Sequence, residues 1–216
     1  MNIILFGPPG AGKGTQANYL VKDFKLCKIS TGDLLRDEIK NSTILGNKIK
    51  SIVNEGLLVS DDTINDLIRK VLSDQKVNNR LIFDGYPRSL NQAKELDLLV
   101  KKSNQKISCA LSLEVDKETI IKRILGRQIC SNCGLIFNEY FSPATVENHN
   151  CDIKFLYKRS DDNEKTIRNR FQTYQDMTLP ILNFYRGQEL LRQINGMAKI
   201  DDISKEIRGI ITSIET

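Results

Sequence analysis

Residues 2–15 read NIILFGPPGAGKGT, in which four apolar residues after Asn2 lead into a stretch rich in glycine and proline that contains Lys13. Glycines allow backbone N–H groups to turn inward around an anion, and a helix that begins at the lysine adds the positive end of its dipole. The lysine ammonium can reach the outer phosphates of a nucleotide, and the hydroxyl of Thr15 can reach a magnesium ion. The pattern therefore predicts a strand, a phosphate-binding loop and a helix in succession.

Apolar runs of strand length alternate with helical patterns along the rest of the chain. The expected strands are residues 2–6, 27–29, 81–84, 109–115 and 198–200. Three of them are almost continuously apolar, as in strands buried on both faces of a parallel sheet. A longer helix over residues 167–182 is expected to bend at Pro180. The alternation predicts an α/β fold of the P-loop type, with a central parallel five-stranded sheet in three layers.

Length and composition fit one globular protein. The chain has 216 residues, 40% of them hydrophobic and 27% charged, which is enough to bury a core without disulfides. Its apolar runs are far shorter than the ~20 residues of a membrane helix, and no secretory signal is expected. An odd number of cysteines, five, predicts a cytoplasmic protein. A net charge of +5 predicts no nucleic-acid partner and suits an anionic small molecule.

Two segments interrupt the alternation of strands and helices. Residues 30–60 carry helical patterns without a strong strand, and residues 127–160 have no helical period and hold three of the five cysteines. Irregular stretches of this length in a compact fold are usually functional or form a small subdomain. The predicted division is a core of residues 1–29, 61–126 and 161–216, with residues 30–60 and 127–160 as separate units.

Charged residues are expected to gather at the phosphate loop. Asp84 ends a buried strand, and ligands of α/β sheets bind beyond the carboxyl ends of strands, so Asp84 and Arg88 should face that loop. Arg123 and Arg127 are four residues apart, a spacing that places them on one helix face. Thr31 fits either helix capping or a ligand site.

The absence of a catalytic-base motif from the sequence also bears on the type of reaction. The single histidine is His149, and no His-Arg-Asp catalytic loop occurs in the chain. A kinase that phosphorylates a hydroxyl needs a base, whereas a monophosphate is already deprotonated at neutral pH. Arginines, whose planar guanidinium matches phosphate, are plentiful. These features favour a phosphate acceptor and a reaction that needs mainly alignment and positive charge.

Several motifs, in order along the chain, resemble those of the adenylate kinases, the long-lid form of the nucleoside monophosphate kinase family. They are GPPGAGKGT at 7–15, STGDLLR at 30–36, FDGYPR at 83–88, GR at 126–127, RSDD at 159–162 and TIRNR at 166–170. The resemblance implies reversible phosphoryl transfer from Mg-ATP to AMP, giving two ADP, by a monomeric enzyme. It also implies that residues 30–60 are an AMP-binding helical segment and that residues 127–160 are a lid over ATP.

The resemblance assigns roles to individual residues. Those implied to hold ATP are Gly10, Ala11, Gly12, Lys13, Gly14, Thr15, Arg123, Arg127, Ile136, Phe137 and Ala198. Those implied to hold AMP are Thr31, Arg36, Leu57, Leu58, Val59, Gly85, Tyr86, Pro87, Arg88, Gln92, Arg159 and Arg170. The implied catalytic set is Lys13, Arg88, Arg123, Arg127, Arg159 and Arg170, and Asp84 would orient magnesium-bound water. Gln128 departs from the pattern, because many relatives carry a second arginine there.

Two alternatives to this activity stay open. A kinase for UMP or CMP is one, because Thr31 and Gln92 favour adenine only through the resemblance. A nucleotide-dependent switch protein is the alternative outside enzymes, although its guanine motif Asn-Lys-x-Asp does not occur in the chain.

Cysteines in residues 127–160 raise the question of a structural metal. Cys130, Cys133 and Cys151 have a spacing typical of zinc sites. Related lids carry a fourth ligand three residues further on, where this chain has Lys154; His149 or Asp152 would have to replace it. The sequence leaves two alternatives open: a zinc ion held by the three cysteines, or a metal-free lid. Lys154 favours the metal-free lid, because it replaces the fourth ligand. Packing of Leu135, Phe137 and Tyr140 would hold the metal-free lid.

Overall fold

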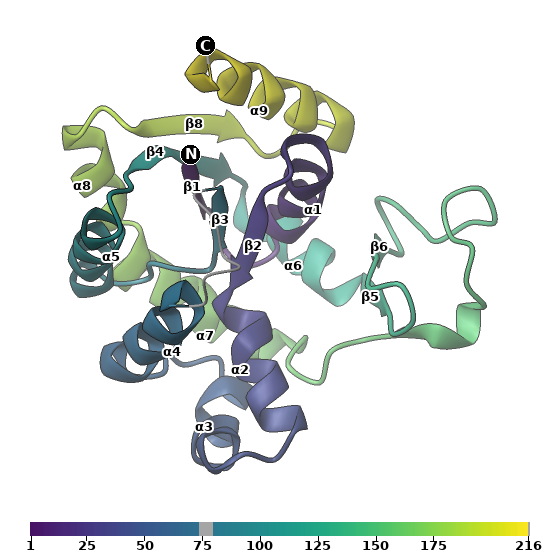
Figure 1. The fold of residues 1–216 in the computed structure, drawn as a ribbon. Helices are drawn as coiled ribbons and strands as arrows, with labels where there is room; N and C mark the ends of the chain where they lie inside the picture. Colours follow the sequence, from purple (N-terminus) through teal and green to yellow (C-terminus); the bar gives the residue numbers. More distant parts are fainter. Residues whose placement is uncertain (74–79, 216) are drawn as a thin grey trace.

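The computed structural model describes residues 1–73 and 80–215, and a five-stranded parallel sheet forms its centre (Figure 1). Its strand order is β2 (Cys27–Ser30), β3 (Leu81–Asp84), β1 (Asn2–Phe6), β4 (Ile107–Glu114) and β8 (Leu191–Asn195). In the middle of the sheet, Ile4 of β1 lies opposite Phe83 on one side and Ala110 on the other. This arrangement confirms the predicted α/β fold.

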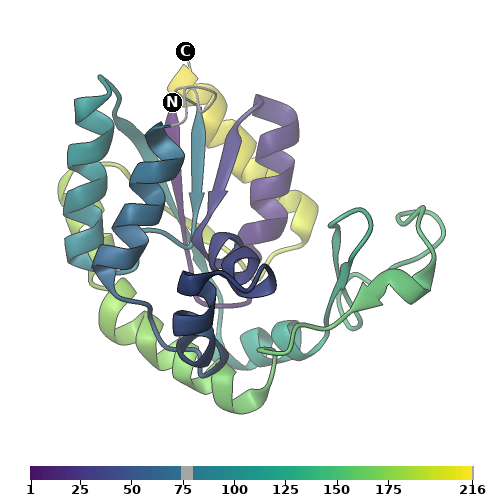
Figure 2. The ribbon, with the colours of Figure 1, turned by 60° about the horizontal axis from the view of Figure 1, so that its bottom comes forward.

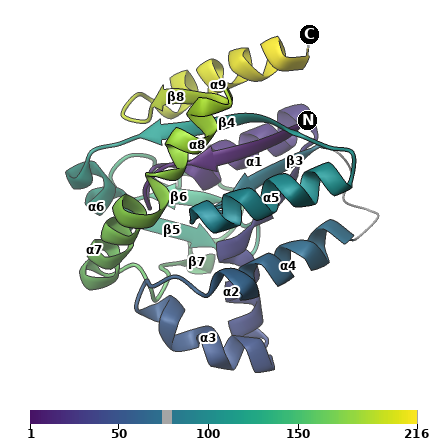
Figure 3. The same ribbon diagram turned by 90° about the vertical axis from the view of Figure 1, so that its left-hand side faces the viewer.

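Helices cover both faces of the sheet (Figure 2, Figure 3). The helices α1 (Lys13–Phe24) and α9 (Ile200–Glu215) pack on one face, and α4 (Asp61–Ser73), α5 (Leu90–Lys102) and α8 (Ile181–Gly187) pack on the other. Neighbouring strand residues point to opposite faces, so Ile3 joins the apolar cluster with α1 and α9 while Ile4 joins the other. Two buried faces explain why the central strands are apolar throughout.

The predicted fifth strand, residues 198–200, was wrong. The fifth strand is β8, Leu191–Asn195, and residues 196–199 form the turn that leads into α9. Strand β8 lies at the edge of the sheet, where Arg192 and Gln193 are exposed and interrupt its apolar pattern. Polar residues are common on edge strands. Here Arg192 and Gln193 interrupt the apolar run by which the strand would have been recognised.

The long helix expected over residues 167–182 is broken, as predicted near Pro180. Helix α7 (Glu164–Thr173) runs into a π-helical turn, η2 (Tyr174–Thr178), and α8 begins at Ile181. Side chains of α7 bind the neighbouring end of α3 (Ile44–Asn54): Thr166 Oγ1 and Asn169 Nδ2 donate to the carbonyl oxygens of Asn54 and Glu55, at 3.1 and 3.0 Å.

Residues 30–60 form a pair of helices beyond the carboxyl end of β2. Helix α2 (Thr31–Lys40) is capped by Ser30, whose hydroxyl accepts from the N–H of Asp33, and α3 (Ile44–Asn54) follows it closely. The two helices meet at Gly46, where an added Cβ would lie 2.0 Å from the carbonyl oxygen of Glu38. Only glycine allows this approach.

Residues 127–160 form a small antiparallel sheet that extends from the core (Figure 1). Its strands are β5 (Arg127–Cys130), β6 (Ile136–Asn138) and β7 (Leu156–Tyr157), and a 3₁₀ turn, η1 (Ile153–Phe155), precedes β7. Helix α6 (Lys117–Leu125), capped by Asp116, ends two residues before Arg127. The prediction that Arg123 and Arg127 share a helix face was therefore wrong, because the helix stops at Gly126.

Across the described part of the chain, no helix combines the length and the apolar character needed to cross a membrane.

Candidate active site

One cavity of about 680 Å³ opens at the carboxyl ends of the central strands, where ligands of such sheets bind. The phosphate loop and β6 line one side of it, and the start of α2, residues 56–59 and the turn after β3 line the other. Most predicted site residues share this cavity: Gly10, Ala11, Gly12, Lys13, Gly14, Thr15, Thr31, Arg36, Leu57, Leu58, Val59, Asp84, Gly85, Pro87, Arg88, Gln92, Arg123, Arg127, Ile136, Phe137, Arg159 and Arg170.

Two of the residues predicted to bind nucleotides do not line it. Tyr86 is buried in the core with 1% exposure, and its hydroxyl donates to Asn65 Oδ1 at 2.8 Å. Ala198 lies in the turn before α9, and the cavity is instead lined from that region by Ile200, Asp201 and Ile203.

The phosphate loop wraps the start of α1. Gly10 and Gly12 have positive φ angles, 79° and 96°, and an added Cβ at position 10 would lie 2.7 Å from Ile124. Helix α1 has no side-chain cap, so its first N–H groups remain available to an anion. The Lys13 ammonium donates to the carbonyl oxygens of Gly7 and Pro8 at 2.6 and 2.9 Å. Burial lowers the pKa of Lys13 to about 8, against the attraction of Asp84.

Backbone oxygens hold the residues on the opposite side. The hydroxyl of Thr31 and the Nε of Arg88 both donate to the carbonyl oxygen of Gly85, at 2.6 and 2.7 Å. The N–H of Arg88 donates to Gln92 Oε1 at 2.8 Å, and its carbonyl oxygen accepts from Thr178 Oγ1 at 3.1 Å. Burial, with repulsion from Arg170, lowers the pKa of Arg88 to about 10. The guanidinium thus projects from a fixed backbone.

Carboxylates of the motif at 159–162 hold two of the predicted catalytic arginines. Arg127 is paired with Asp162 and Arg170 with Asp161, and both carboxylates are almost fully buried. Desolvation raises the pKa of Asp161, but the charge of Arg170 and its hydrogen bond outweigh that effect and lower it. The sequence prediction quoted both aspartates within a motif but gave them no role. Their position beside Arg159 was the available signal.

A lysine between two carboxylates was also missed. Lys28 Nζ of β2 lies 3.7 Å from Asp33 Oδ2 and 3.9 Å from Asp84 Oδ2, and all three line the cavity. Asp84 presents its carboxylate beside Gly14, where an added Cβ would be 3.8 Å from Oδ2. Carboxylate oxygens next to a phosphate site are the ligands that magnesium, or its bound water, prefers. The donor set therefore fits a magnesium ion carried with nucleotide phosphates.

Arg123 joins the core to the small sheet. Its Nη1 donates to the carbonyl oxygen of Ala11 in the phosphate loop at 3.4 Å, and its guanidinium lies 5.7 Å from the ring centre of Phe141. Its own carbonyl oxygen accepts from Asn138 Nδ2 at 2.7 Å. Burial lowers the pKa of Arg123. Arg123 therefore contacts both the phosphate loop and the small sheet.

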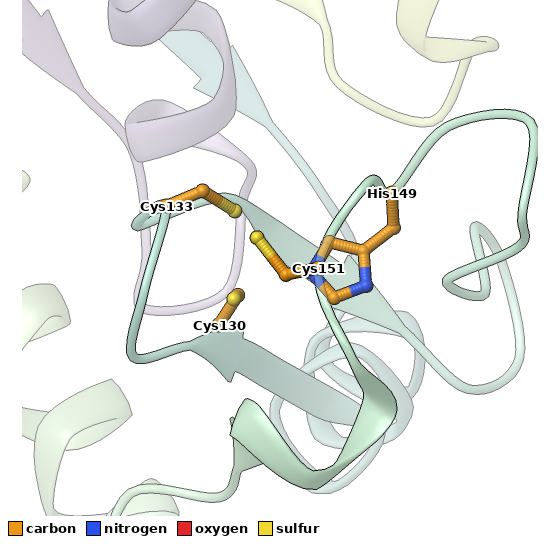
Figure 4. A group of neighbouring side chains, drawn as sticks. All are labelled: Cys130, Cys133, His149 and Cys151. Atoms are coloured by element: carbon orange, nitrogen blue, oxygen red, sulfur yellow. The ribbon is translucent and has the colours of Figure 1, made fainter.

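Four possible metal ligands meet in the small sheet (Figure 4). The ligand atoms of Cys130, Cys133, His149 and Cys151 all lie within 4.8 Å of one another. Asn132 Nδ2 donates to the sulfur of Cys151 at 3.3 Å. Desolvation raises the pKa of the Cys130 thiol, but hydrogen bonds with the Cys133 backbone and His149 bring it down to about 6. These hydrogen bonds favour the thiolate form of Cys130, the form that binds metals.

The sequence left two candidates for a fourth metal ligand, His149 and Asp152, and in the structure His149 is the one that lies beside the three cysteines. It is buried at 6% exposure, and its Nε2 has no hydrogen-bond partner within residues 1–73 and 80–215. The other candidate, Asp152, pairs with Lys154 at 3.2 Å and caps the turn η1 instead. Of the residues predicted to pack a metal-free lid, Phe137 is buried, whereas Leu135 and Tyr140 are 44% and 65% exposed.

The arrangement of loop, arginines and helical pair has counterparts among known proteins. A family model described as adenylate kinase matches residues 5–190 of the chain. The chain belongs to the adenylate kinase family. The adenylate kinase of Pelagibacter ubique is 44% identical over 98% of this chain and 99% of its own length. Those of Caldicellulosiruptor bescii and Geotalea uraniireducens are 42% and 41% identical, over 96% and 98% of this chain and 97% and 98% of their own lengths.

As an adenylate kinase, the protein is an ATP:AMP phosphotransferase, which confirms the activity that the motifs implied. The alternatives of a UMP or CMP kinase and of a switch protein are not supported. The substrates of this adenylate kinase are nucleotides, and its phosphate loop is the element that begins the match with the family.

Proposed function

We propose that this cavity holds both nucleotides of the adenylate kinase reaction at once, with ATP on the phosphate-loop side and AMP under α2 and α3. This placement of the two nucleotides rests on one observation, which is that the same cavity extends from Lys13 to Gln92. A phosphoryl group could then pass directly between two phosphates without entering solvent.

Charge balance supports this map. ATP and AMP together bring about six negative charges, since a terminal monoester carries up to about −2 at neutral pH. The residues that line the cavity include the cations Lys13, Lys28, Arg36, Arg88, Arg123, Arg127, Arg159 and Arg170. Phosphoryl transfer depends on alignment and on stabilising the charge of the transferred group, and these residues supply both.

Each side of the cavity has its own group of residues. The loop of residues 10–15, with Arg123 and Arg127, would hold the ATP phosphates, and Ile136 and Phe137 would lie against its base. Thr31, Arg36, residues 57–59, Gly85, Arg88 and Gln92 would hold AMP. Arg159 and Arg170 would bridge the two, and buried Asp161 orients Arg170 for that task.

Asp84 would hold the magnesium ion through water, and Lys28 balances its charge at 3.9 Å. When bound, the magnesium ion neutralises charge on the ATP phosphates. The chain's own residues position the reactants: no base is needed, because the acceptor phosphate is deprotonated at neutral pH. Residues 30–60 and 127–160 would close over the two nucleotides and exclude water, which would otherwise accept the phosphoryl group.

The ligand cluster in the small sheet supports a structural zinc ion held by Cys130, Cys133, His149 and Cys151. A tetrahedral zinc with bonds of about 2.0–2.3 Å places its ligand atoms about 3.3–3.8 Å apart, which is compatible with four ligand atoms that all lie within 4.8 Å of one another. The unpartnered Nε2 of His149 shows that the buried imidazole has bonding capacity to spare. Such an ion would fix residues 127–160 as one unit.

Matched substitutions on the two sides test this map. Arg88→Lys should lower kcat/KM for AMP about 100-fold, because a point charge cannot replace a guanidinium fork, and should leave ATP binding unchanged. Arg123→Lys should show the opposite preference, with the loss on the ATP side. Calorimetric titration of each variant with ATP alone decides the case. Loss of ATP affinity in Arg88→Lys would show that the two sides are reversed.

A further inference from the structure

The carboxamide of Gln92 is held in one orientation at the AMP side of the cavity. Its side chain lines the cavity but is only 2% exposed. The N–H of Arg88 donates to Gln92 Oε1 at 2.8 Å, and Gln92 Nε2 donates to Asp61 Oδ1 at 2.6 Å. The oxygen and nitrogen of an amide have nearly the same shape, so these partners alone decide which atom lies where.

Asp61, the first residue of α4, is surrounded by donors. Its Oδ2 accepts from Ser89 Oγ at 2.7 Å and from Asn91 Nδ2 at 3.3 Å, while Oδ1 accepts from Gln92. A carboxylate can only accept hydrogen bonds, so Gln92 cannot turn its oxygen toward Asp61. Ser89 in turn caps α5 by accepting from the N–H of Gln92 at 3.1 Å. The network therefore joins α4 to the residue that faces the nucleotide.

Orientation decides which purine the amide can match. With these two bonds made, Gln92 retains one N–H on Nε2 and one lone pair on Oε1. Adenine presents an amino donor beside a ring-nitrogen acceptor, the pair that a glutamine amide binds in a bidentate manner. On its Watson–Crick edge, hypoxanthine presents the same two positions with donor and acceptor interchanged, since O6 accepts and N1–H donates. An amide with its oxygen and nitrogen exchanged would match hypoxanthine instead.

We propose that Asp61 is a positioning residue that selects adenine as the acceptor base by fixing the orientation of the Gln92 carboxamide. The inference rests on the proposed function, which places the AMP base beside Gln92. Asp61 itself lies behind Gln92 and is absent from the described residues that line the cavity. Its effect therefore passes through Gln92.

Substitution by an amide of equal size tests the proposal. Asp61→Asn places a donor at position 61, so this position no longer excludes the exchanged orientation of the Gln92 carboxamide and only the N–H of Arg88 still favours the present one. We expect kcat/KM for AMP to fall about tenfold or more, while kcat/KM for IMP stays level or rises, so that the AMP-to-IMP ratio collapses. Asp62→Asn is the matched control, because Asp62 is the next acidic residue of the same helix turn and is exposed. An unchanged AMP-to-IMP ratio in Asp61→Asn would overturn the proposal.

Two further measurements separate orientation from simple stability. The double variant Asp61→Asn, Gln92→Glu can re-form both hydrogen bonds, since the new amide donates to the new carboxylate. Its melting temperature should recover, whereas AMP turnover should stay low because the N–H that faces the base is gone. Recovery of AMP turnover together with stability would assign Asp61 a structural role only. KM for ATP should not change in any of these variants.

Gln92→Ala distinguishes the two proposals from each other. If it leaves AMP turnover unchanged, the proposed place of the AMP base is wrong. If it impairs AMP turnover while Asp61→Asn leaves the purine preference intact, the AMP site stands and Asp61 does not select the base.

Discussion

The ammonium nitrogen of Lys13 lies 2.6 Å from the carbonyl oxygen of Gly7, so the phosphate loop binds its own lysine across the turn. Pro8 supplies a second carbonyl at 2.9 Å. The loop thereby holds a buried cation at the point where nucleotide phosphates are expected, and the Lys13 side chain is restrained before any substrate arrives. Two predictions concern this lysine.

Lys13→Met should remove the cation that stabilises the phosphoryl group during transfer. We expect kcat/KM to fall by about 10³ or more, as for the loss of a transition-state charge in phosphoryl transfer. A coupled assay of ADP formation measures the loss, with circular dichroism to confirm the fold. Turnover near that of the wild type in a folded variant would contradict the assigned role.

The same substitution should change stability in a pH-dependent way. Because burial lowers the pKa of Lys13 from 10.5 to about 8, the unfolded chain binds this proton more tightly than the folded one. The burial of this charged lysine therefore lowers the free energy of unfolding. This destabilisation is fully present below pH 8 and disappears as the pH rises from 8 to 10.5. Lys13→Met should therefore be most stabilising, relative to wild type, below pH 8, and this advantage should shrink above it. Urea unfolding across this pH range measures the difference, and Lys22→Met controls for removal of an exposed lysine from α1.

Gly46→Ala should separate α2 from α3. The new methyl group would lie 2.0 Å from the Glu38 carbonyl oxygen, which belongs to the backbone and cannot rotate away. We expect a loss of about 3 kcal/mol in unfolding free energy and a higher KM for AMP, with little change in KM for ATP. Gly209→Ala, on α9 with open space around it, is the matched control. Equal stability of the two variants would show that the helices separate without cost.

Zinc analysis tests the metal cluster. Protein purified without chelator should hold one zinc ion per chain, and chelation should lower the melting temperature and raise KM for ATP more than KM for AMP. His149→Ala should weaken zinc retention, whereas Asp152→Asn should not, because Asp152 is paired with Lys154. Absence of zinc, with no effect of chelator, would leave Phe137 and its neighbours to hold this sheet without a metal.

The sequence predicted features that depend on neighbouring residues. The phosphate loop could be located because its glycines, its lysine and the flanking strand are contiguous, and Asp116 could be recognised as a cap from the helical pattern after it. Strand β8 was missed because Arg192 and Gln193 interrupt its apolar pattern at the sheet edge. Arg127 was misplaced because its four-residue spacing from Arg123 crosses the end of α6.

Contacts between distant segments could not be derived in this way. Nothing in the local sequence joins Lys28 to Asp84, or Asp61 to Gln92, because tertiary folding alone brings these pairs together. The same holds for His149, which reaches Cys130 and Cys133 only through the fold of the loop between β6 and η1. The resemblance to a family assigns roles to individual residues, but it does not identify the partners that orient them.

The hydrogen bonds from Thr166 and Asn169 to the end of α3 have an evolutionary consequence. Their acceptors are main-chain carbonyls, which every amino acid at positions 54 and 55 supplies equally. Substitutions there leave the anchor intact, whereas deletion of one residue from α3 would rotate those carbonyls by about 100° around the helix axis, away from α7. This anchor therefore constrains the length of α3 and not the identities of the residues at positions 54 and 55.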